Sequence, residues 1–311
     1  MSAFEEMEQD GTIWMNGEYV DWEDAQVHVL THAMHYGTGI FEGVRAYDTE
    51  EGTAIFRWEE HLDRFYNSAK PYDMEIEFSR EELTEATLEV VRRNDLDSAY
   101  VRPLAYYGYD SLGVSPGDCP TDVTIAAWPW GAYLGEEALE NGIEVKVSSW
   151  RKHASSQIPT NAKTTGLYVN SMLAGEEARR HGYEEAIVLN KEGNVAEGPG
   201  ENIFLVRDGE LFTPGLSESI LDGITRDTVI TLAEERGYEV HDNVSISRGE
   251  LHTADELFFT GSAAEVTPIR QVDNVEIGEG GRGPVTEELQ SAFFDLVERR
   301  TDDHEEWFTY V

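Results

Sequence analysis

The sequence is poor in cysteine and contains no long apolar run. Its 311 residues include one cysteine, Cys119, which excludes an intramolecular disulfide framework and a metal site built from cysteines. No stretch of about 18 consecutive apolar residues is present, so we expect no membrane-spanning helix. The first residues, MSAFEEMEQD, are acidic, whereas a secretory signal is basic and then apolar. These absences predict a water-soluble, cytoplasmic protein.

Basic residues are scarce as well. Lysine and arginine number 23 against 62 aspartates and glutamates, which gives a net charge of −39 and argues against nucleic-acid binding through a basic face. A folded chain with this charge repels itself at low ionic strength, and molar salt, with a Debye length of about 3 Å, screens that repulsion. The acidic residues are spread over the whole chain, which resembles the proteins of halophiles that accumulate salt. An acidic surface that scaffolds cationic partners is the alternative.

The spacing of apolar residues predicts short strands and amphipathic helices along the whole chain. The predicted strands are Val27–Val29, Val44–Tyr47, Thr53–Arg57, Ala99–Tyr107, Thr121–Trp130, Ile143–Ser149, Ala186–Leu189, Asn202–Arg207, Glu210–Phe212 and Glu256–Thr260. The predicted helices are Glu59–Ala69, Arg80–Asn94, Tyr168–His181, Thr225–Arg236 and Val285–Arg299. Because strands and helices do not alternate strictly, the pattern favours a mixed α+β fold over a doubly wound sheet.

A cluster of proline and glycine at Pro129, Gly131 and Gly135 predicts an interdomain linker. We place this linker at residues 130–140. It would join a smaller N-terminal α/β domain, residues 1–129, to a larger β-rich C-terminal domain, residues 141–311.

Since only five lysines occur, a lysine among small residues is conspicuous. Lys163 lies in Asn161-Ala162-Lys163-Thr164-Thr165-Gly166, just before the predicted helix at Tyr168. A lysine amine that is removed from water has a lowered pKa and becomes a nucleophile. Lys163 is therefore a candidate for a Schiff base with a cofactor aldehyde, and a surface lysine in a loop is the alternative.

Three turns of small residues are candidates for contact with a ligand. Residues 197–202, EGPGEN, place Glu197 at a bend where it can reach inward. Residues 222–227 open a helix at Thr225, where free N–H groups and the helix dipole favour an anion. Residues 260–264, TGSAA, offer the hydroxyl of Ser262. The alternatives are a solvated turn, an ordinary helix N-cap and an ordinary strand-to-loop turn, respectively.

Two other patterns do not support a site. Residues 278–283 match the dinucleotide pattern GxGxxG, but Pro284 follows and no second βαβ unit can be built there. His28, His32 and His35 would share one face of a helix, but no carboxylate completes a zinc motif. We therefore predict neither a nucleotide site nor a metal site.

Eight short motifs together carry a family resemblance. They are MHYGTGIFEGVRAY at 34–47, YVRPL at 100–104, WGAYLG at 130–135, NAK at 161–163, GEEARRHGY at 175–183, EGPGEN at 197–202, GITRD at 223–227 and GSAAE at 261–265. In this order and spacing they resemble the class IV aminotransferases, and within that class the branched-chain amino acid aminotransferases. The resemblance runs from about Trp14 to Tyr310.

The resemblance implies fold type IV of the pyridoxal-phosphate enzymes, with pyridoxal 5'-phosphate bound between the two domains. Lys163 would form the Schiff base, and its freed amine would transfer the catalytic proton. Glu197 would keep the ring nitrogen protonated, and Tyr168 would hydrogen-bond the phenolic oxygen of the cofactor. The phosphate would be bound by Arg64, Ile224, Thr225 and Ser262.

The resemblance also implies a substrate pocket that accepts a branched apolar side chain in one half-reaction and the second carboxylate of glutamate in the other. Arg102 would bind that distal carboxylate in bidentate geometry. Tyr100 and the backbone of Ser262 and Ala263 would bind the α-carboxylate. The remaining pocket residues would be Tyr36, Phe41, Gly43, Trp130, Tyr133 and Tyr168.

The implied reaction is a ping-pong exchange of an amino group between L-leucine, L-isoleucine or L-valine and 2-oxoglutarate. The resemblance further implies a homo-oligomer, either a dimer or a dimer-based hexamer. The alternatives are a D-amino acid aminotransferase or an aminodeoxychorismate lyase on the same fold, or a non-catalytic binding protein that retains it. The Tyr-x-Arg motif at Tyr100 favours L-branched substrates, and the retained Lys163, Glu197 and Arg64 speak against a silent protein. Serine at 262, where the family often has threonine, keeps the hydroxyl.

Overall fold

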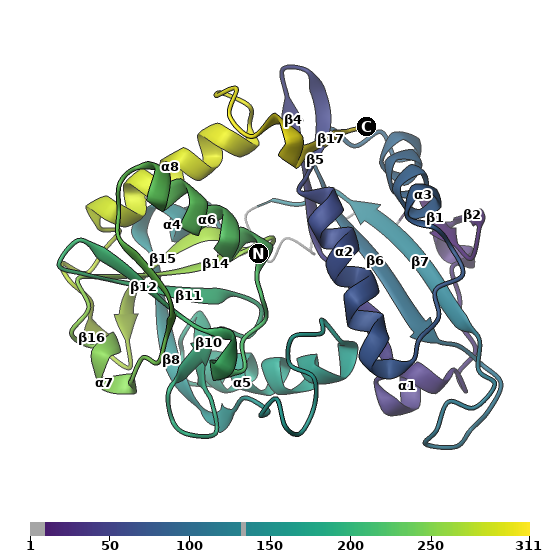
Figure 1. Ribbon diagram of the computed structural model, residues 1–311, viewed down its shortest axis with the longest axis horizontal. Coiled ribbons are helices and arrows are strands. Elements are labelled where there is room, and N and C mark those ends of the chain that lie inside the picture. The colour runs from purple at the N-terminus through teal and green to yellow at the C-terminus, as the bar shows by residue number, and fades with distance from the viewer. Residues whose placement is uncertain (1–9, 132–134) are drawn as a thin grey trace.

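The computed structural model describes residues 10–131 and 135–311, and the strands within them form two separate sheets. The two sheets occupy opposite sides of the molecule in Figure 1, each with helices packed on it. Strands and helices mix without regular βαβ repeats, which confirms the α+β fold expected from the sequence. None of the helices in the described residues is long and apolar enough to cross a bilayer.

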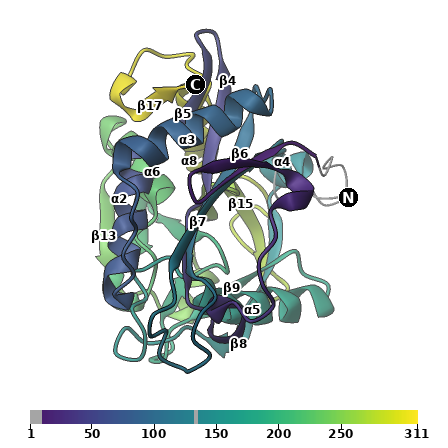
Figure 2. The same ribbon diagram turned by 90° about the vertical axis from the view of Figure 1, so that its right-hand side faces the viewer.

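The first sheet is antiparallel, with the strand order β17-β5-β4-β6-β7-β1-β2 and with β3 paired to β6. Its strands are β1 Thr12–Met15, β2 Glu18–Asp21, β3 Gly39–Phe41, β4 Val44–Thr49, β5 Gly52–Phe56, β6 Ala99–Tyr107, β7 Thr121–Trp128 and β17 Phe308–Tyr310. Helices α2 (Trp58–Ala69) and α3 (Arg80–Arg93) belong to this half (Figure 2), as does α1 (His32–Tyr36) (Figure 1). Leu62 and Phe65 of α2 and Leu83 of α3 are buried in one core cluster with the sheet, because residues at helical spacing share one face.

The second sheet is mixed, with the strand order β10-β9-β8-β15-β14-β11-β12-β13 and with β16 paired to β15. Its strands are β8 Ile143–Arg151, β9 Glu185–Leu189, β10 Val195–Glu197, β11 Asn202–Arg207, β12 Glu210–Pro214, β13 Val240–Val244, β14 Glu256–Gly261, β15 Glu265–Val272 and β16 Val275–Glu276. The accompanying helices are α4 Glu136–Asn141, α5 Tyr168–Arg180, α6 Ile224–Glu235, α7 Arg248–Leu251 and α8 Pro284–Val297. Helix α5 packs on β8 and β9, while α6 and α8 pack near β14.

An apolar cluster joins the two halves. Phe56 of the first sheet lies 6.1 Å, between ring centroids, from Phe293 of α8 and 5.5 Å from Phe308 of β17. Tyr47 of the first sheet belongs to the same cluster as Phe258 of the second. Burial of one such side chain stabilises the folded chain by about 1.5 to 3 kcal/mol, so this cluster fixes the two halves relative to each other.

Most predicted elements are confirmed within a few residues; the strand Ala99–Tyr107 and the start of the helix at Tyr168 are right. The predicted strand Val27–Val29 is wrong, because no strand within residues 10–131 or 135–311 pairs with this segment and the two valines are 47% and 65% exposed. Helix α4, Glu136–Asn141, overlaps the second half of the predicted linker at residues 130–140. The division into domains at residues 130–140 stays a prediction, and β17, from the far end of the chain, lies in the first sheet.

Candidate active site

A pocket of about 600 Å³, counting space open to solvent, lies where α2 approaches the second half of the chain. Its walls come from α2, residues 152–171, the end of β10 with the turn that follows, the start of α6, and the turn after β14. The structure brings together at this pocket all the residues predicted to bind the cofactor: Arg64, Lys163, Tyr168, Glu197, Ile224, Thr225 and Ser262.

Lys163 directs its amine toward Tyr168 in this pocket. Its backbone N–H donates to Ser68 Oγ over 3.0 Å, and its carbonyl accepts from the N–H of Phe41 over 3.0 Å. Lys163 Nζ donates to the hydroxyl of Tyr168 over 2.7 Å. Burial and the nearby Arg64 lower the pKa of Lys163 to about 8. About a tenth of the amine is therefore neutral at pH 7, and the neutral amine is the nucleophilic form.

Tyr168 is the first residue of α5, and its ring meets that of Phe41 edge-on with 4.7 Å between centroids. Burial raises the pKa of Tyr168 to about 12, so the phenol is neutral at physiological pH. A neutral hydroxyl accepts one hydrogen bond and donates another. While it accepts from Lys163, Tyr168 can donate to an oxygen of a bound ligand.

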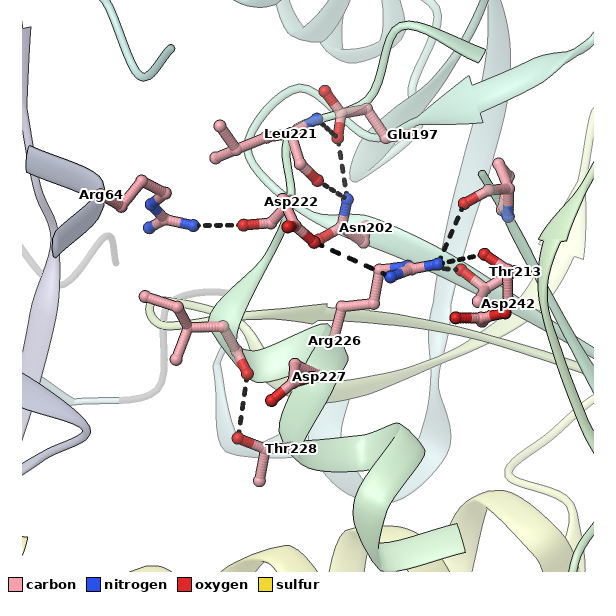
Figure 3. A network of polar contacts seen from close by, with 12 residues as sticks. Arg64, Glu197, Asn202, Thr213, Leu221, Asp222, Arg226, Asp227, Thr228 and Asp242 are labelled. Carbon is pink, nitrogen blue, oxygen red and sulfur yellow. Dashed lines mark hydrogen bonds and ion pairs between the residues drawn. The ribbon is translucent and has the colours of Figure 1, made fainter. Parts of the chain in front are cut away.

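Glu197 ends β10 and is 5% exposed. Its Oε2 accepts from Asn202 Nδ2 over 2.9 Å and from the N–H of Leu221 over 3.0 Å (Figure 3). Its other oxygen, Oε1, contacts the ammonium group of Lys152. Two fixed N–H donors and the Lys152 ammonium group hold this carboxylate in one orientation, in which it can accept a hydrogen bond from a protonated ring nitrogen.

Arg64 projects from α2, with its guanidinium held on two sides. Nε and Nη2 donate to the two oxygens of Glu42 over 2.7 and 2.8 Å, and Nη1 donates to the carbonyl of Asp222 over 2.7 Å. Burial alone would raise the pKa of Glu42, but Arg64 and His61 lower it well below its usual range. Three of the five guanidinium N–H groups are thereby used, and two remain for an anion.

The start of α6 offers further donors. Ile224 and Thr225 line the pocket at the first turn of this 12-residue helix, where backbone N–H groups and the dipole favour an anion. Ser262 lies opposite, in the turn after β14. The hydroxyl of Thr260, beside it, is buried and has no hydrogen-bond partner among the described residues. Polar groups of this kind are satisfied when an oxyanion binds.

Aromatic rings lie around the guanidinium group of Arg102, and one of them, that of Phe41, also lies near Lys163. The guanidinium carbon of Arg102 lies 4.8 Å from the ring centroid of Phe41 and 5.3 Å from that of Tyr100, and Lys163 Nζ lies 5.1 Å from the same Phe41 ring. Trp130 stacks near Tyr100 with 4.8 Å between centroids. The side chain of Arg102 has no hydrogen bond or ion pair with any described residue, and its Nε is buried. A cation held only by aromatic rings is prepared for an anionic ligand.

Gly43 packs directly against Tyr100, since an added Cβ would lie 1.9 Å from the Tyr100 hydroxyl oxygen. Tyr36 is not brought to the site within this chain, because it is 42% exposed and donates to the carbonyl of Leu112 over 3.1 Å. Ala263 follows Ser262 but does not line the pocket. Tyr133 lies outside the described residues.

The sequence analysis assigned no role to four residues that lie at the site: Lys152, Glu42, Asn202 and Thr260. The scarcity of lysine was a signal for Lys152, which lies near Glu197. Glu42 and Asn202 stand inside motifs that were noticed. Glu42 contacts Arg64 across 22 positions and Asn202 contacts Leu221 across 19, and no local pattern predicts contacts of this kind.

The three histidines do not share a helix face. Helix α1 begins at His32, so His28 lies outside it. His32 is buried, with Nδ1 2.7 Å from Thr38 Oγ1 and Nε2 3.0 Å from the carbonyl oxygen of Gly113. These contacts give His32 a structural role.

Comparison with known proteins agrees with this site. The family model described as amino-transferase class IV matches residues 39–272. The chain therefore belongs to the class IV aminotransferases, which confirms the resemblance found in the sequence.

The similar proteins share one description. The branched-chain-amino-acid aminotransferase of Pseudomonas aeruginosa is 54% identical over 304 residues, which cover 98% of either chain. The solved branched-chain amino acid aminotransferase of Escherichia coli has a TM-score of 0.94 and 52% identity, covering 96% of this chain and 98% of its own. A third similar protein is the branched-chain aminotransferase of the thermophilic archaeon Thermoproteus uzoniensis, solved with norvaline. Its TM-score is 0.91 and its identity 42%, and the match covers 96% of this chain and 99% of its own.

One further solved structure shows a ligand that combines cofactor and substrate. It is a branched-chain amino acid aminotransferase complexed with N-(5'-phosphopyridoxyl)-L-glutamate. Its TM-score is 0.92 and its identity 49%, and the match covers 97% of this chain and 98% of its own.

Proposed function

We propose that the chain is a transaminase that exchanges an amino group between L-leucine, L-isoleucine or L-valine and 2-oxoglutarate, with pyridoxal 5'-phosphate as its cofactor. The similar proteins are branched-chain amino acid aminotransferases that align over nearly their full length. The observation that carries the proposal is the Lys163 amine with a lowered pKa, which contacts Tyr168 in the pocket that Glu197 and Arg64 also line.

The residues present fit pyridoxal 5'-phosphate. The cofactor needs an amine for its aldehyde, an acid for its ring nitrogen and fixed donors for its phosphate. Lys163 supplies the amine and Glu197 the acid. The start of α6, Arg64 and Ser262 supply donors, and the partnerless hydroxyl of Thr260 adds one more.

Bound pyridoxal 5'-phosphate supplies an aldehyde carbon and an electron-accepting ring. Lys163 would hold the aldehyde of the cofactor, and with substrate bound its amine would take the proton from the substrate Cα. A pKa of about 8 suits an amine that must both accept and return a proton near neutral pH. Glu197 holds the proton on the ring nitrogen, and Tyr168 orients the Lys163 amine through their hydrogen bond.

Arg102 and its aromatic neighbours support the dual substrate range. A branched side chain packs on the rings of Phe41, Tyr100 and Trp130. The distal carboxylate of glutamate or 2-oxoglutarate pairs instead with Arg102, which has no competing ion pair in the described residues. The similar structure that holds N-(5'-phosphopyridoxyl)-L-glutamate supports glutamate as the second substrate.

A visible spectrum tests this proposal. The purified protein in high salt should absorb above roughly 400 nm, and addition of L-isoleucine should bleach that band, whereas absence of the band would exclude the cofactor. Initial rates with L-valine, D-alanine and aminodeoxychorismate then separate this transaminase from its two relatives on the same fold. Lys163→Ala should abolish transamination, and unchanged activity would favour a different class of protein.

An exposed apolar surface around α1 supports a homo-oligomer, either a dimer or a dimer-based hexamer. We name it the α1 surface, and it comprises Val27, Val29, Met34, Tyr36, Tyr109, Leu112 and Val114. A second copy of the chain would cover it and would remove the exposed ring of Tyr36 from water. Leu112→Asp should lower the molar mass measured by light scattering, whereas Val275→Asp, also exposed but elsewhere, should not. Equal masses for both variants would exclude this interface.

The net charge of −39 supports a protein adapted to high salt. Transaminase activity and the temperature of unfolding should both rise toward molar KCl. If both fall instead, the acidic residues serve another purpose, such as binding cationic partners. Because one cysteine leaves no pair for a disulfide, we also propose a cytoplasmic location.

A further inference from the structure

The segment Leu221–Gly223 links two ends of the proposed cofactor site (Figure 3). The N–H of Leu221 donates to Glu197 Oε2 over 3.0 Å, and the carbonyl of the next residue, Asp222, accepts from Arg64 Nη1 over 2.7 Å. The acid assigned to the ring nitrogen and the arginine assigned to the phosphate therefore contact consecutive residues of one backbone segment. A displacement of this segment changes both contacts at once.

Asn202 joins this segment to Glu197. It is the first residue of β11 and is 5% exposed. Its Nδ2 donates to Glu197 Oε2 over 2.9 Å and to the carbonyl of Leu221 over 2.9 Å. Both of these partners are acceptors, so only the NH₂ end of the amide can face them, and both of its protons are used.

The other end of the same amide meets Gly223. A Cβ added to Gly223 would lie 1.9 Å from Asn202 Oδ1, so the absence of a side chain at Gly223 lets the segment approach. Asn202 is thus enclosed by Glu197 on one side and by both ends of the segment on the other. The amide does not titrate, so its two donor protons are present at every pH.

We propose that Asn202 is a positioning residue that holds the Glu197 carboxylate and the segment Leu221–Gly223 in one geometry, and so couples ring protonation to phosphate binding. The inference rests on the proposed function. It adds to it a residue that acts through Glu197 and through the backbone that contacts Arg64. Without the Asn202 amide, Glu197 Oε2 keeps only the hydrogen bond from the Leu221 N–H. Leu221 in turn loses the hydrogen bond that its carbonyl accepts from Asn202.

Asn190 provides a matched control in the same half of the chain. It is also a buried asparagine, 3% exposed, whose Nδ2 contacts a buried carboxylate, that of Glu218. It does not line the proposed cofactor pocket. Asn190→Ala therefore reports the general cost of removing a buried amide from beside a carboxylate that does not line the cofactor pocket.

The test compares pyridoxal 5'-phosphate with its 1-deaza analogue, which lacks the ring nitrogen. Dissociation constants are measured on the cofactor-free full chain by quenching of protein fluorescence. The wild-type chain should prefer the natural cofactor, because only it can pair with Glu197. Asn202→Ala should reduce this preference on the order of tenfold or more, the effect of losing a hydrogen bond to a charged group. Asn202→Ser, which keeps one donor, should be intermediate, and Asn190→Ala should match wild type.

A second readout tests the coupling. Competition by inorganic phosphate should weaken severalfold in Asn202→Ala, although the Asn202 amide donates its hydrogen bonds to Glu197 and Leu221 and to no residue of α6. In a Glu197→Gln background, Asn202→Ala should cause little further loss of ring preference.

Three outcomes overturn the inference. In the first, Asn202→Ala and Asn202→Ser both keep the preference for the natural cofactor over its 1-deaza analogue, and the competition by inorganic phosphate, within about twofold of wild type. A difference of that size is near the error of double-mutant cycles, so Asn202 would be a packing residue only. An equal loss in Asn190→Ala would show a general folding effect. A wild-type chain that binds no pyridoxal 5'-phosphate would overturn the proposed function, and this inference with it.

Discussion

Replacement of Arg102 by methionine should separate the two half-reactions of the proposed transaminase. Arg102 is held in the described residues only by aromatic rings, those of Phe41, Tyr100 and Trp128. Cation–π contacts contribute about 0.5 to 1 kcal/mol each at partly exposed sites, and methionine, similar in length, packs favourably on the same rings. We therefore expect the free energy of unfolding to change by less than about 2 kcal/mol.

The effect on the second substrate should be much larger. Loss of the charged hydrogen bonds to the distal carboxylate costs about 2 to 3 kcal/mol, which is a factor of about 30 to 150 in kcat/KM. Leucine has no distal charge, so its half-reaction should change by less than about threefold, or about 0.7 kcal/mol.

Single-turnover kinetics with L-leucine and with L-glutamate measure the two half-reactions separately. Arg207→Met is the control, since Arg207 also lies over an aromatic ring, that of Phe212 at 4.7 Å, but belongs to the hairpin of β11 and β12. An equal loss with leucine and glutamate in Arg102→Met would refute the assignment of Arg102 to the distal carboxylate.

Two further predictions concern Lys163 and Gly43. Because the pKa of Lys163 is lowered to about 8, the rate at which cofactor-free protein binds pyridoxal 5'-phosphate should rise about tenfold per pH unit below that value and level off above it; a midpoint near the ordinary pKa of lysine would contradict the burial of this amine. Gly43→Ala places a Cβ 1.9 Å from the Tyr100 hydroxyl oxygen, so urea unfolding should show a loss of about 1 to 3 kcal/mol and KM for amino acids should rise. Gly281→Ala, which meets no atom within 4 Å, should change neither, and equal stability of the two variants would argue against the close contact.

Elements with strong local patterns were predictable from the sequence. The helix at Tyr168–Arg180 and the strand Ala99–Tyr107 carry apolar residues at the spacing that their burial requires. Val27–Val29 has the same local pattern but pairs with no strand that the structure describes, and its valines are exposed. The short strand β17 forms by pairing with β5, which lies about 250 positions earlier in the chain. No local pattern in the sequence predicts such a pair.

The candidate site was predictable to the extent that its motifs are local. Lys163, Glu197 and Thr225 stand in short motifs rich in small residues, and the structure places them around one pocket. The partners that orient these residues were not predictable. Glu42 reaches Arg64 across 22 positions and Leu221 reaches Glu197 across 24, so such contacts depend on how the chain folds back. The roles of these site residues remain predictions.

Reductive trapping tests the central claim most directly. Borohydride treatment of the protein with bound pyridoxal 5'-phosphate, followed by peptide mass spectrometry, fixes the cofactor to the amine that holds it. The chain has only five lysines, and Lys152 lies in the same pocket as Lys163, so it serves as an internal comparison. We expect the pyridoxyl group on Lys163 alone, and a tag on Lys152 or on no lysine would contradict the account.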